Sequence, residues 1–172
     1  DCYSNGSVCS PTRAALMTGR YQQRIGLEWA VYYGVSGEGL PPQEKSIARM
    51  MRTAGYATGL SGKWHLGYDR QRGPNHHGFD HFFGLLGGNH HYFEHYDRKG
   101  RPDLFLNTQP IQREGYSTDL IAGDAVEFIA ASVGRPFFLY ASFSAPHFPY
   151  QGPDDADRLV TPRKGWQTGT RR

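Results

Sequence analysis

Cys9 and Arg13 are the first residues whose types and spacing could do chemistry on an anion. The thiol stands just before a short helical segment and the guanidinium lies one turn inside it, so Cys9 is expected in a positive field. Lys63 and His65 follow one apolar segment of the chain, and His147 follows another. Because arginine suits the planar recognition of oxyanions, these five side chains point to chemistry on a small anionic group.

Each of these residues also has an ordinary structural alternative. Cys9 could be a buried core thiol or could pair with Cys2 in a disulfide, and Arg13 could be a solvated helix residue. A lysine and a histidine two positions apart in a turn are often surface residues, and a histidine after a strand can simply cap it. The choice depends on the elements that carry the residues and on the wider motif.

Two helices are predicted in the first third of the chain from the residues at their ends. A helix is expected over 10–19, because Ser10 suits the N-cap, Pro11 the first helical position and Gly19 the exit. A second helix is expected over about 43–54, followed by a strand over 56–61. Its apolar face is predicted to consist of Ile47, Met50, Met51 and Ala54.

A second helix and strand pair is expected later in the chain, over 118–132 and 137–143. The near-continuous apolar run 137–143 is typical of a parallel strand covered on both faces. Two such units favour an α/β fold with a mainly parallel sheet flanked by helices, in which ligands collect at the carboxyl ends of the strands. Lys63, His65 and His147 are therefore expected on one rim. The apolar stripe of the second of these helices is predicted at Ile121, Ala125, Phe128 and Ile129.

Residues 67–112 show no sustained period of either kind, and a loop of this length in a compact domain is usually functional. Six histidines lie here, at positions 76, 77, 81, 90, 91 and 95. A metal site is disfavoured, because no helical period or acidic cluster completes a ligand shell. Recognition of a sugar or an aromatic sulfate is the favoured role, with packing as the alternative. The candidates for it are Asn89, His90, His91, Tyr92 and His95, with Trp29, Tyr32 and Tyr33 in an earlier loop.

The composition sets outer limits on the class of protein. With 22 Gly and 11 Pro among 172 residues the chain is loop-rich, and its length excludes two large domains. No apolar run approaches the roughly 20 residues that span a bilayer. The net charge of +3 comes from 15 Arg and 4 Lys without a basic stripe, so nucleic acid is not an expected partner. Two cysteines exclude a disulfide scaffold and a cysteine-based zinc site.

The segment Cys9-Ser10-Pro11-Thr12-Arg13, continuing into Leu16-Met17-Thr18-Gly19-Arg20, resembles the signature of the type I sulfatases. In that family a formylglycine-generating enzyme oxidises the cysteine of C-x-P-x-R to formylglycine. One hydroxyl of the hydrated aldehyde attacks sulfur and the other expels sulfate. The resemblance implies that Cys9, Pro11 and Arg13 form the modification motif, and that Arg13 holds the modified residue in place.

Two further segments resemble the same family. Gly62-Lys63-Trp64-His65-Leu66-Gly67 resembles its second signature, which implies that Lys63 bridges the sulfate and the formylglycine and that His65 is the base. The run 136–140, followed by Ala145-Pro146-His147-Phe148-Pro149, resembles its strand with a sulfate-contacting histidine. By that resemblance His147 binds the ester and assists the leaving oxygen.

The resemblance covers most of 1–153 and implies an alkaline-phosphatase-like sulfatase domain of the arylsulfatase A and N-acetylgalactosamine-6-sulfatase branch. It also implies a calcium ion, for which this chain would supply only Cys9 as formylglycine, the other ligands lying outside the chain. Residues 1–153 are accordingly expected to be an incomplete catalytic domain, inactive by itself, and 154–172 a polar continuation. Asp154-Asp155 is interpreted as solvated rather than as the missing ligand pair.

The function expected from the resemblance is hydrolysis of a sulfate ester of a glycan or an aryl alcohol. The alternatives are a phosphonate or phosphodiester hydrolase of the same superfamily, or an inactive relative that binds sulfated glycans. A periplasmic, extracellular or lysosomal location is expected from the family alone, and no oligomeric state is indicated.

Overall fold

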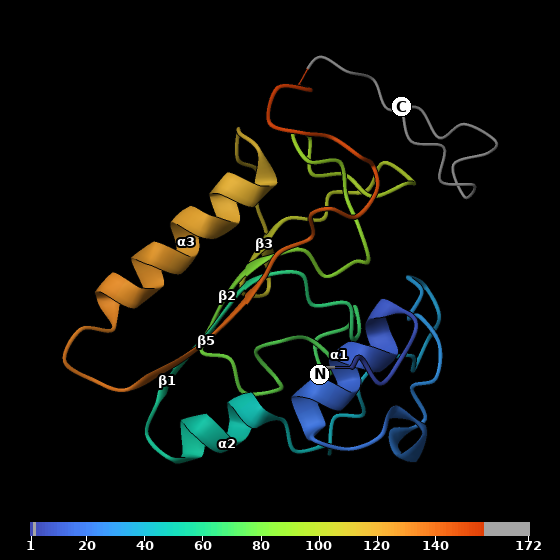
Figure 1. Cartoon of the computed structure of the whole chain (residues 1–172), viewed down its shortest axis with the longest axis vertical. Coiled ribbons are helices and arrows are strands. Elements are labelled where there is room, and N and C mark those ends of the chain that lie inside the picture. Colours follow the sequence, from blue (N-terminus) through green and yellow to red (C-terminus); the bar gives the residue numbers. More distant parts are fainter. Residues whose placement is uncertain (2, 157–172) are drawn as a thin grey trace.

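The computed structural model describes residues 1 and 3–156, which form a five-stranded sheet between helices (Figure 1). The strand order is β4-β3-β2-β1-β5. Strand β1 (Ala57–Gly62) pairs in parallel with β2 (His81–Gly84) on one side and with β5 (Phe137–Ser142) on the other. Strands β3 (Phe105–Leu106) and β4 (Gln109–Pro110) continue the sheet as an antiparallel edge. The expected α/β architecture is confirmed.

Helices cover both faces of the sheet, and β1 shows how the sequence separates them (Figure 1). Helix α3 (Ser117–Ala131) packs on one face, where Phe128 lies directly over Gly59 and Asp124 accepts a hydrogen bond from Ser61. Leu60, between these two positions, points to the other face and packs in the core of α1 (Cys9–Thr18) and α2 (Ile47–Thr53). Alternate residues of a strand face opposite sides, so one strand anchors both layers.

Two apolar cores result, one on each side of the sheet. The larger one lies beneath α1 and α2 and includes the fully buried Trp64, two residues after the end of β1. The smaller one lies beneath α3 and includes Ile121. A four-residue 3₁₀ helix, η1 (Gln22–Ile25), follows α1 and packs against it.

The ends of the first two helices differ from those expected. Helix α1 begins at Cys9 with Val8 as its N-cap, because the hydroxyl of Ser10 accepts a hydrogen bond from the N–H of Val31, 3.0 Å away, and does not cap the helix. Helix α2 is shorter than expected, since Ser46 caps it by accepting from the N–H of Arg49. Its buried residue is Ala48, and Met50 is 62% exposed.

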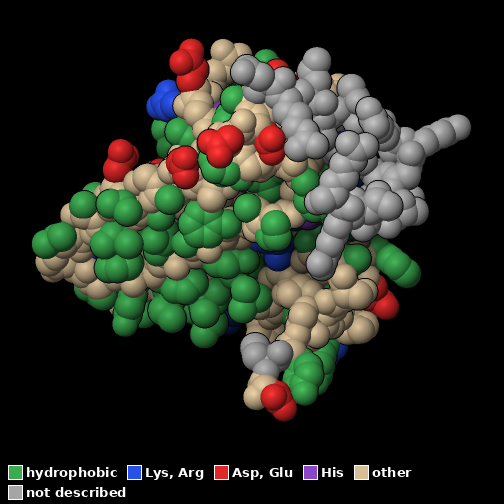
Figure 2. Space-filling view, turned by 45° about the horizontal axis from the view of Figure 1, so that its top comes forward, with side chains coloured by type: hydrophobic (Ala, Val, Ile, Leu, Met, Phe, Trp, Pro, Cys, Tyr) green, Lys and Arg blue, Asp and Glu red, His purple; other side chains and the backbone are tan. Residues whose placement is uncertain are grey.

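Strand β5 and the outer face of α3 are less buried than their sequences predicted. The run 137–143 was expected to be covered on both faces, but β5 is an edge strand within the described chain, and Phe137 is 41% exposed. Ile129, expected in the buried stripe of α3, is 42% exposed, whereas Ile121 and Ala125 are buried. Figure 2 shows hydrophobic side chains gathered over the arm that α3 and β5 form.

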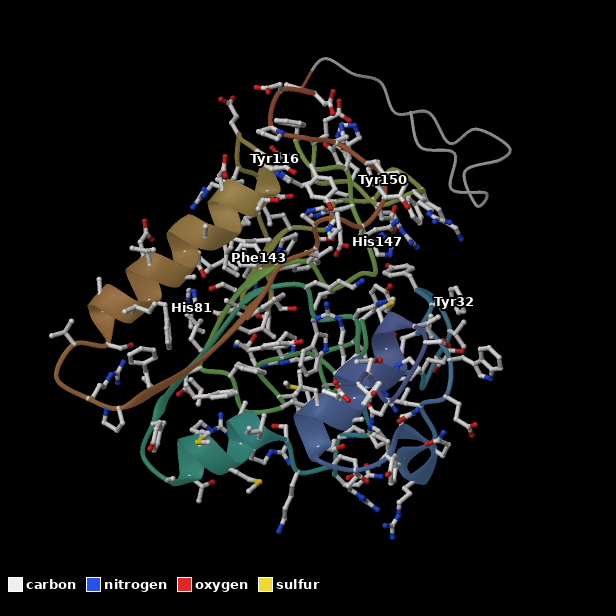
Figure 3. All side chains as sticks on the ribbon, in the orientation of Figure 1. Tyr32, His81, Tyr116, Phe143, His147 and Tyr150 are labelled. Carbon is white, nitrogen blue, oxygen red and sulfur yellow. The ribbon has the colours of Figure 1, made fainter. Side chains whose placement is uncertain are left out.

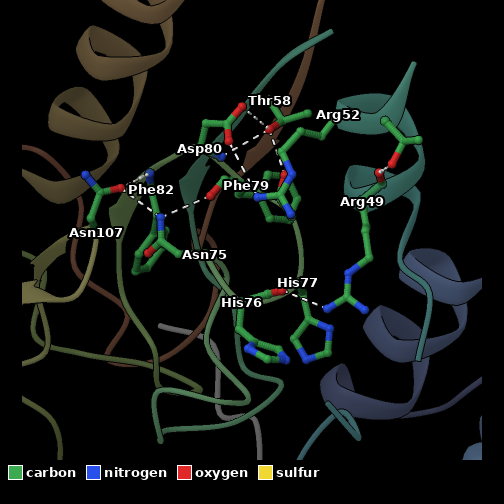
Figure 4. Close-up of polar contacts among 12 residues, drawn as sticks. Arg49, Arg52, Thr58, Asn75, His76, His77, Phe79, Asp80, Phe82 and Asn107 are labelled. Atoms are coloured by element: carbon green, nitrogen blue, oxygen red, sulfur yellow. Dashed lines mark hydrogen bonds and ion pairs between the residues drawn. The ribbon is translucent and has the colours of Figure 1, made fainter. Parts of the chain in front are cut away.

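The segment 67–112, expected to be one long loop, contains β2, β3 and β4. Its first part is fastened by polar side chains, shown in Figure 4. Thr58 donates to the carbonyl of Gly78, 2.7 Å away, and Arg49 donates to the carbonyl of His76, 2.8 Å away. Asn107, which has a left-handed backbone (φ 54°), accepts from both the Asn75 amide and the N–H of Phe82. The conformation of this segment is thus set by side-chain hydrogen bonds, which explains why its sequence shows no helix or strand period.

Within residues 1 and 3–156, no helix is long and apolar enough to cross a membrane. Asp154 is exposed, as expected, and Asp155 accepts a hydrogen bond from the N–H of Gly152 in its own turn. The polar segment expected over 154–172 lies mostly outside the described residues, as does Cys2.

Candidate active site at the ends of the parallel strands

The site is assembled where β1 and β5 end side by side. These strands are parallel neighbours, and the N–H of Lys63, just after β1, donates to the carbonyl of Ser142, 2.7 Å away at the end of β5. The chain leaving β1 carries Lys63 and His65, the chain leaving β5 carries His147, and the start of α1 brings Cys9 to the same rim. Figure 3 shows His147 at this end of the sheet, with Tyr32 nearby in the view.

Cys9 and His65 are in direct contact. The Sγ atom of Cys9, a free thiol, lies 3.0 Å from Nδ1 of His65. The other ring nitrogen, Nε2, lies 3.0 Å from the carbonyl of Val31, which can only accept, so Nε2 carries the proton. Nδ1 is thereby left with its lone pair directed at Cys9, as an acceptor for any hydroxyl or thiol at that position.

His65 is held neutral by its surroundings. Burial, together with the neighbouring charge of Lys63, lowers its pKa to about 3. Its backbone has φ 55°, a left-handed conformation that is uncommon outside glycine and costs on the order of 1 kcal/mol or more. Strain of this kind concentrates at functional positions.

Lys63 is a buried cation beside Cys9. Its side chain is 2% exposed, and this burial lowers its pKa to about 8, although the adjacent Cys9 and the more distant Asp103 act to raise it. Lys63 is therefore mostly protonated at neutral pH. A buried ammonium in this position can stabilise negative charge that collects next to Cys9.

Arg13 connects three elements of the site. Its Nη1 donates to the carbonyl of Lys63 and to Oγ of Ser142, both 2.6 Å away, and to the hydroxyl of Tyr140 at 3.3 Å. Burial lowers the pKa of this guanidinium, while Tyr140 and Cys9 act to raise it. Arg13 thus fixes the turn after β1 against the end of β5, and holds Lys63 through its backbone.

His147 is positioned by the segment 89–92. Its Nδ1 lies 2.9 Å from the carbonyl of Phe148 and so carries a proton, which makes Nε2 the acceptor nitrogen of the neutral ring. The hydroxyl of Tyr92 donates to the carbonyl of His147, and the amide of Asn89 donates to the carbonyl of Phe148. Burial lowers the pKa of His147, and Lys63, Arg98 and Arg13 add to this effect.

The other residues expected to recognise a substrate lie deeper than the sequence suggested. His90 and Tyr92 are each 1% exposed, and His90 uses Nδ1 on the carbonyl of Asp103. His91 contacts the amide of Gln151. Burial therefore places these side chains beneath the rim, where Tyr92 contacts His147, His91 contacts Gln151 and His90 contacts Asp103. By contrast, the exposed aromatic side chains near Val31 are Trp29, Tyr32 and Tyr33.

Two residues that the sequence did not single out shape the position of His65. Gly88 lies against the imidazole, so closely that a Cβ at this position would come within 2.6 Å of Cε1. Asp103, 5% exposed, accepts hydrogen bonds from the N–H groups of Leu86 and Gly87 and so fixes this loop. Burial raises the pKa of Asp103 to about 7. The pair Gly87-Gly88 was the one available signal, since adjacent glycines mark a close backbone approach.

The described residues do not form a calcium site by themselves. Within 1 and 3–156, no three His, Cys, Asp or Glu side chains gather as a metal-binding group. Beside Cys9 lies a cavity of about 340 Å³, whose walls include Ser4, Thr12, Arg13 and Tyr140, without a carboxylate.

A buried cation, a neutral imidazole and a thiol at a helix start lie together at the ends of parallel strands of an α/β fold, and their charges suit an oxyanion. Comparison with known proteins gives the family: the sulfatase family model matches residues 1–168. An arylsulfatase of Hemicentrotus pulcherrimus is 37% identical over 95% of this chain and 32% of its own length. The N-acetylgalactosamine-6-sulfatase of Mus musculus is 35% identical over 86% of this chain and 32% of its own length.

The crystal structure of Ps i-CgsB is similar in three dimensions, with a TM-score of 0.83 and 35% identity over 89% of this chain and 38% of that one. The chain belongs to the sulfatase family. It spans about a third of the length of the curated relatives it matches.

Proposed function

We propose that the protein hydrolyses sulfate esters of glycans or aryl alcohols, with Cys9 converted to formylglycine as its nucleophile. The observation that carries this proposal is the Cys9 to His65 contact, in which the lone pair of Nδ1 faces position 9 at 3.0 Å. In the unmodified protein Sγ occupies the place that a hydroxyl of the hydrated formylglycine would take. That hydrate supplies one hydroxyl to attack sulfur and a second to release sulfate.

His65 acts as the base at that second hydroxyl. Because Nε2 is committed to Val31, only Nδ1 can accept the proton, and it faces the correct atom. The low pKa of about 3 keeps His65 free of a proton throughout the neutral range. Its basicity rises when negative charge arrives beside it, because a nearby anion stabilises the imidazolium. His65 can thus take the proton when sulfate leaves.

Lys63 and His147 bind the sulfate group from two sides. Lys63 is charged at neutral pH and buried beside Cys9, so it stabilises the sulfate oxygens as charge moves onto them. Nε2 of His147, the nitrogen not used on the carbonyl of Phe148, is proposed to face the sulfate, and an anion there raises the pKa of His147 and favours its protonation. Once protonated, Nε2 can donate to the oxygen that leaves with the alcohol. Arg13 positions Lys63 through its carbonyl.

The calcium ion of the family is part of the proposal for the whole protein. Cys9, as formylglycine, is the residue of this chain that would contact it. The other ligands are proposed to come from outside residues 1–172, in keeping with an incomplete catalytic domain. Calcium, as a hard cation, would neutralise charge on the oxygens beside position 9.

Glycans and aryl sulfates are the proposed substrates for two reasons. The two curated relatives carry the names arylsulfatase and N-acetylgalactosamine-6-sulfatase. In addition, Trp29 and Tyr32 expose 79% and 65% of their surface near Val31, whose carbonyl holds His65. Exposed aromatic rings suit the face of a sugar or of an aryl group.

The test compares two preparations of the same full-length protein, made with and without a formylglycine-generating enzyme. Mass spectrometry of the Cys9 peptide reports the modification, and hydrolysis of an aryl sulfate, a phosphonate monoester and a phosphodiester reports the reaction. We expect formylglycine and sulfate release only in the first preparation. An unaltered thiol in it would indicate the inactive, glycan-binding alternative. Preferred cleavage of the phosphorus substrates would indicate the other hydrolase class.

A further inference from the structure

Arg98 and Phe148 form a stacked pair next to His147. The guanidinium carbon of Arg98 lies 3.9 Å from the centre of the Phe148 ring, and the centre of that ring lies 4.9 Å from the centre of the His147 ring. Phe148 is itself held in place, since its carbonyl accepts from Asn89 and from Nδ1 of His147. Arg98 is thus one aromatic ring away from the imidazole proposed to bind sulfate.

The charge of Arg98 is available to a ligand. Arg98 is exposed, and among the described residues no carboxylate forms an ion pair with it. Arg101, in the same loop, is a useful contrast: it stacks on Tyr33 at 3.5 Å, but Asp97 accepts from its Nε and Nη2. Among residues 1 and 3–156, Arg101 is therefore paired with a carboxylate and Arg98 is not.

Stacking prepares Arg98 for an anion. With its central carbon over the ring of Phe148, Arg98 keeps its N–H donors in the plane of the guanidinium, and this fork matches a planar or tetrahedral oxyanion. The ring also limits the rotamers of the long side chain, so less entropy is lost when an anion binds. The influence of Arg98 on the pKa of His147 agrees with their closeness.

We propose that Arg98, stacked on Phe148, binds a second anionic group of the substrate, a sulfate or a carboxylate, beside the sulfate ester held by Lys63 and His147. The substrate class is then a glycan with at least two acidic groups, and Arg98 is a specificity residue. This inference rests on the proposed function, since it takes His147 and Lys63 as the first anion site.

The test measures binding by calorimetry to the full-length protein in its thiol form, which cannot turn over. Three disaccharides are compared: one with a single sulfate, one with two sulfates, and one with a sulfate and a uronate carboxylate. We expect at least tenfold tighter binding of one or both doubly charged ligands. Arg98→Gln should reduce that preference to within about threefold, and Lys99→Gln, at the exposed neighbouring cation, should retain it. Rising salt should weaken the preference, because Arg98 is exposed.

The ligand that loses its advantage in Arg98→Gln identifies the second group as a sulfate or a carboxylate. No preference in the wild type, a preference that survives Arg98→Gln, or an equal loss for all three ligands would overturn the inference. Thermal unfolding of Arg98→Gln verifies that the variant is folded. Because binding is read without turnover, a failure of sulfate hydrolysis leaves this result interpretable, and the two proposals can fail separately.

Discussion

His65 directs Nδ1 at the thiol of Cys9, 3.0 Å away, because its Nε2 donates to the carbonyl of Val31. A backbone group fixes the tautomer, so the choice of Nδ1 as acceptor does not depend on a neighbouring side chain. The base of the proposed reaction is thus oriented before any substrate arrives, which reduces the reorganisation needed at the reacting atoms.

Replacing His65 by glutamine should remove proton acceptance while leaving the site polar. We expect kcat for an aryl sulfate to fall by about 10²–10⁴, the usual contribution of a positioned general base, with a smaller change in KM. Steady-state kinetics on the formylglycine form measures both. His76→Gln, at an exposed histidine, is the control and should keep wild-type kcat. A kcat within threefold of wild type in His65→Gln would exclude His65 as the base.

Gly88→Ala tests the contact between the loop and the imidazole. The new Cβ would lie 2.6 Å from Cε1 of His65, a ring already held at both nitrogens, so the ring must move. We expect kcat to drop at least about tenfold, since small displacements of catalytic groups are costly. Gly123→Ala, in α3 with no neighbouring atom within 4 Å, should retain kcat and stabilise the fold by about 0.5–1 kcal/mol. Equal kcat in the two variants would contradict the role of Gly88.

Arg13→Lys tests the link between β1 and β5. Lysine keeps the charge but cannot reproduce the planar donor that contacts Lys63, Tyr140 and Ser142. Chemical denaturation should show a loss of roughly 2–3 kcal/mol, with reduced kcat. The matched substitution Arg20→Lys affects an exposed ion pair with Glu44 and should cost less than about 1 kcal/mol. If both variants are equally stable, the hydrogen bonds of Arg13 do not stabilise the packing of the end of β1 against the end of β5.

His77 should make the protein acid-labile. In the unfolded chain it takes up a proton below about pH 6.5, whereas burial in the fold lowers its pKa to about 4. Between these values the unfolded state binds more protons at His77, so the contribution of His77 to stability is full above pH 6.5 and falls as the pH drops toward 4. His77→Phe keeps a ring against Trp64 but cannot titrate. Between pH 7 and pH 4 its free energy of unfolding should therefore fall by roughly 2–3 kcal/mol less than that of the wild type.

The measurement is the free energy of unfolding of both proteins at several pH values between 7 and 4. Asp103, whose raised pKa of about 7 has the opposite effect over this range, is present in both proteins and cancels in the comparison. If the free energy of unfolding changes with pH in the same way in the wild type and in His77→Phe, His77 does not cause the loss of stability in acid.

The helices and the two parallel strands that carry the site could be predicted, because their signals are local. Apolar runs bounded by glycine and proline placed β1 and β5 within one residue, and helix α3 followed from its stripe at Ile121 and Ala125. The short strands β2, β3 and β4 were missed, since they are defined by pairing partners rather than by periodicity. The N-cap of α1 was also wrong, because Ser10 is used in a long-range contact with Val31.

The sequence alone determined which residues could act. The structure brings them together at one end of the sheet: Cys9, Arg13, Lys63, His65 and His147. The tertiary structure decided how each of them is held. Which nitrogen of His65 faces Cys9 depends on a carbonyl 34 residues away, and the availability of Arg98 depends on where Asp97 and Phe148 lie. Such properties come from burial and from partners distant in the chain, and no local pattern encodes them.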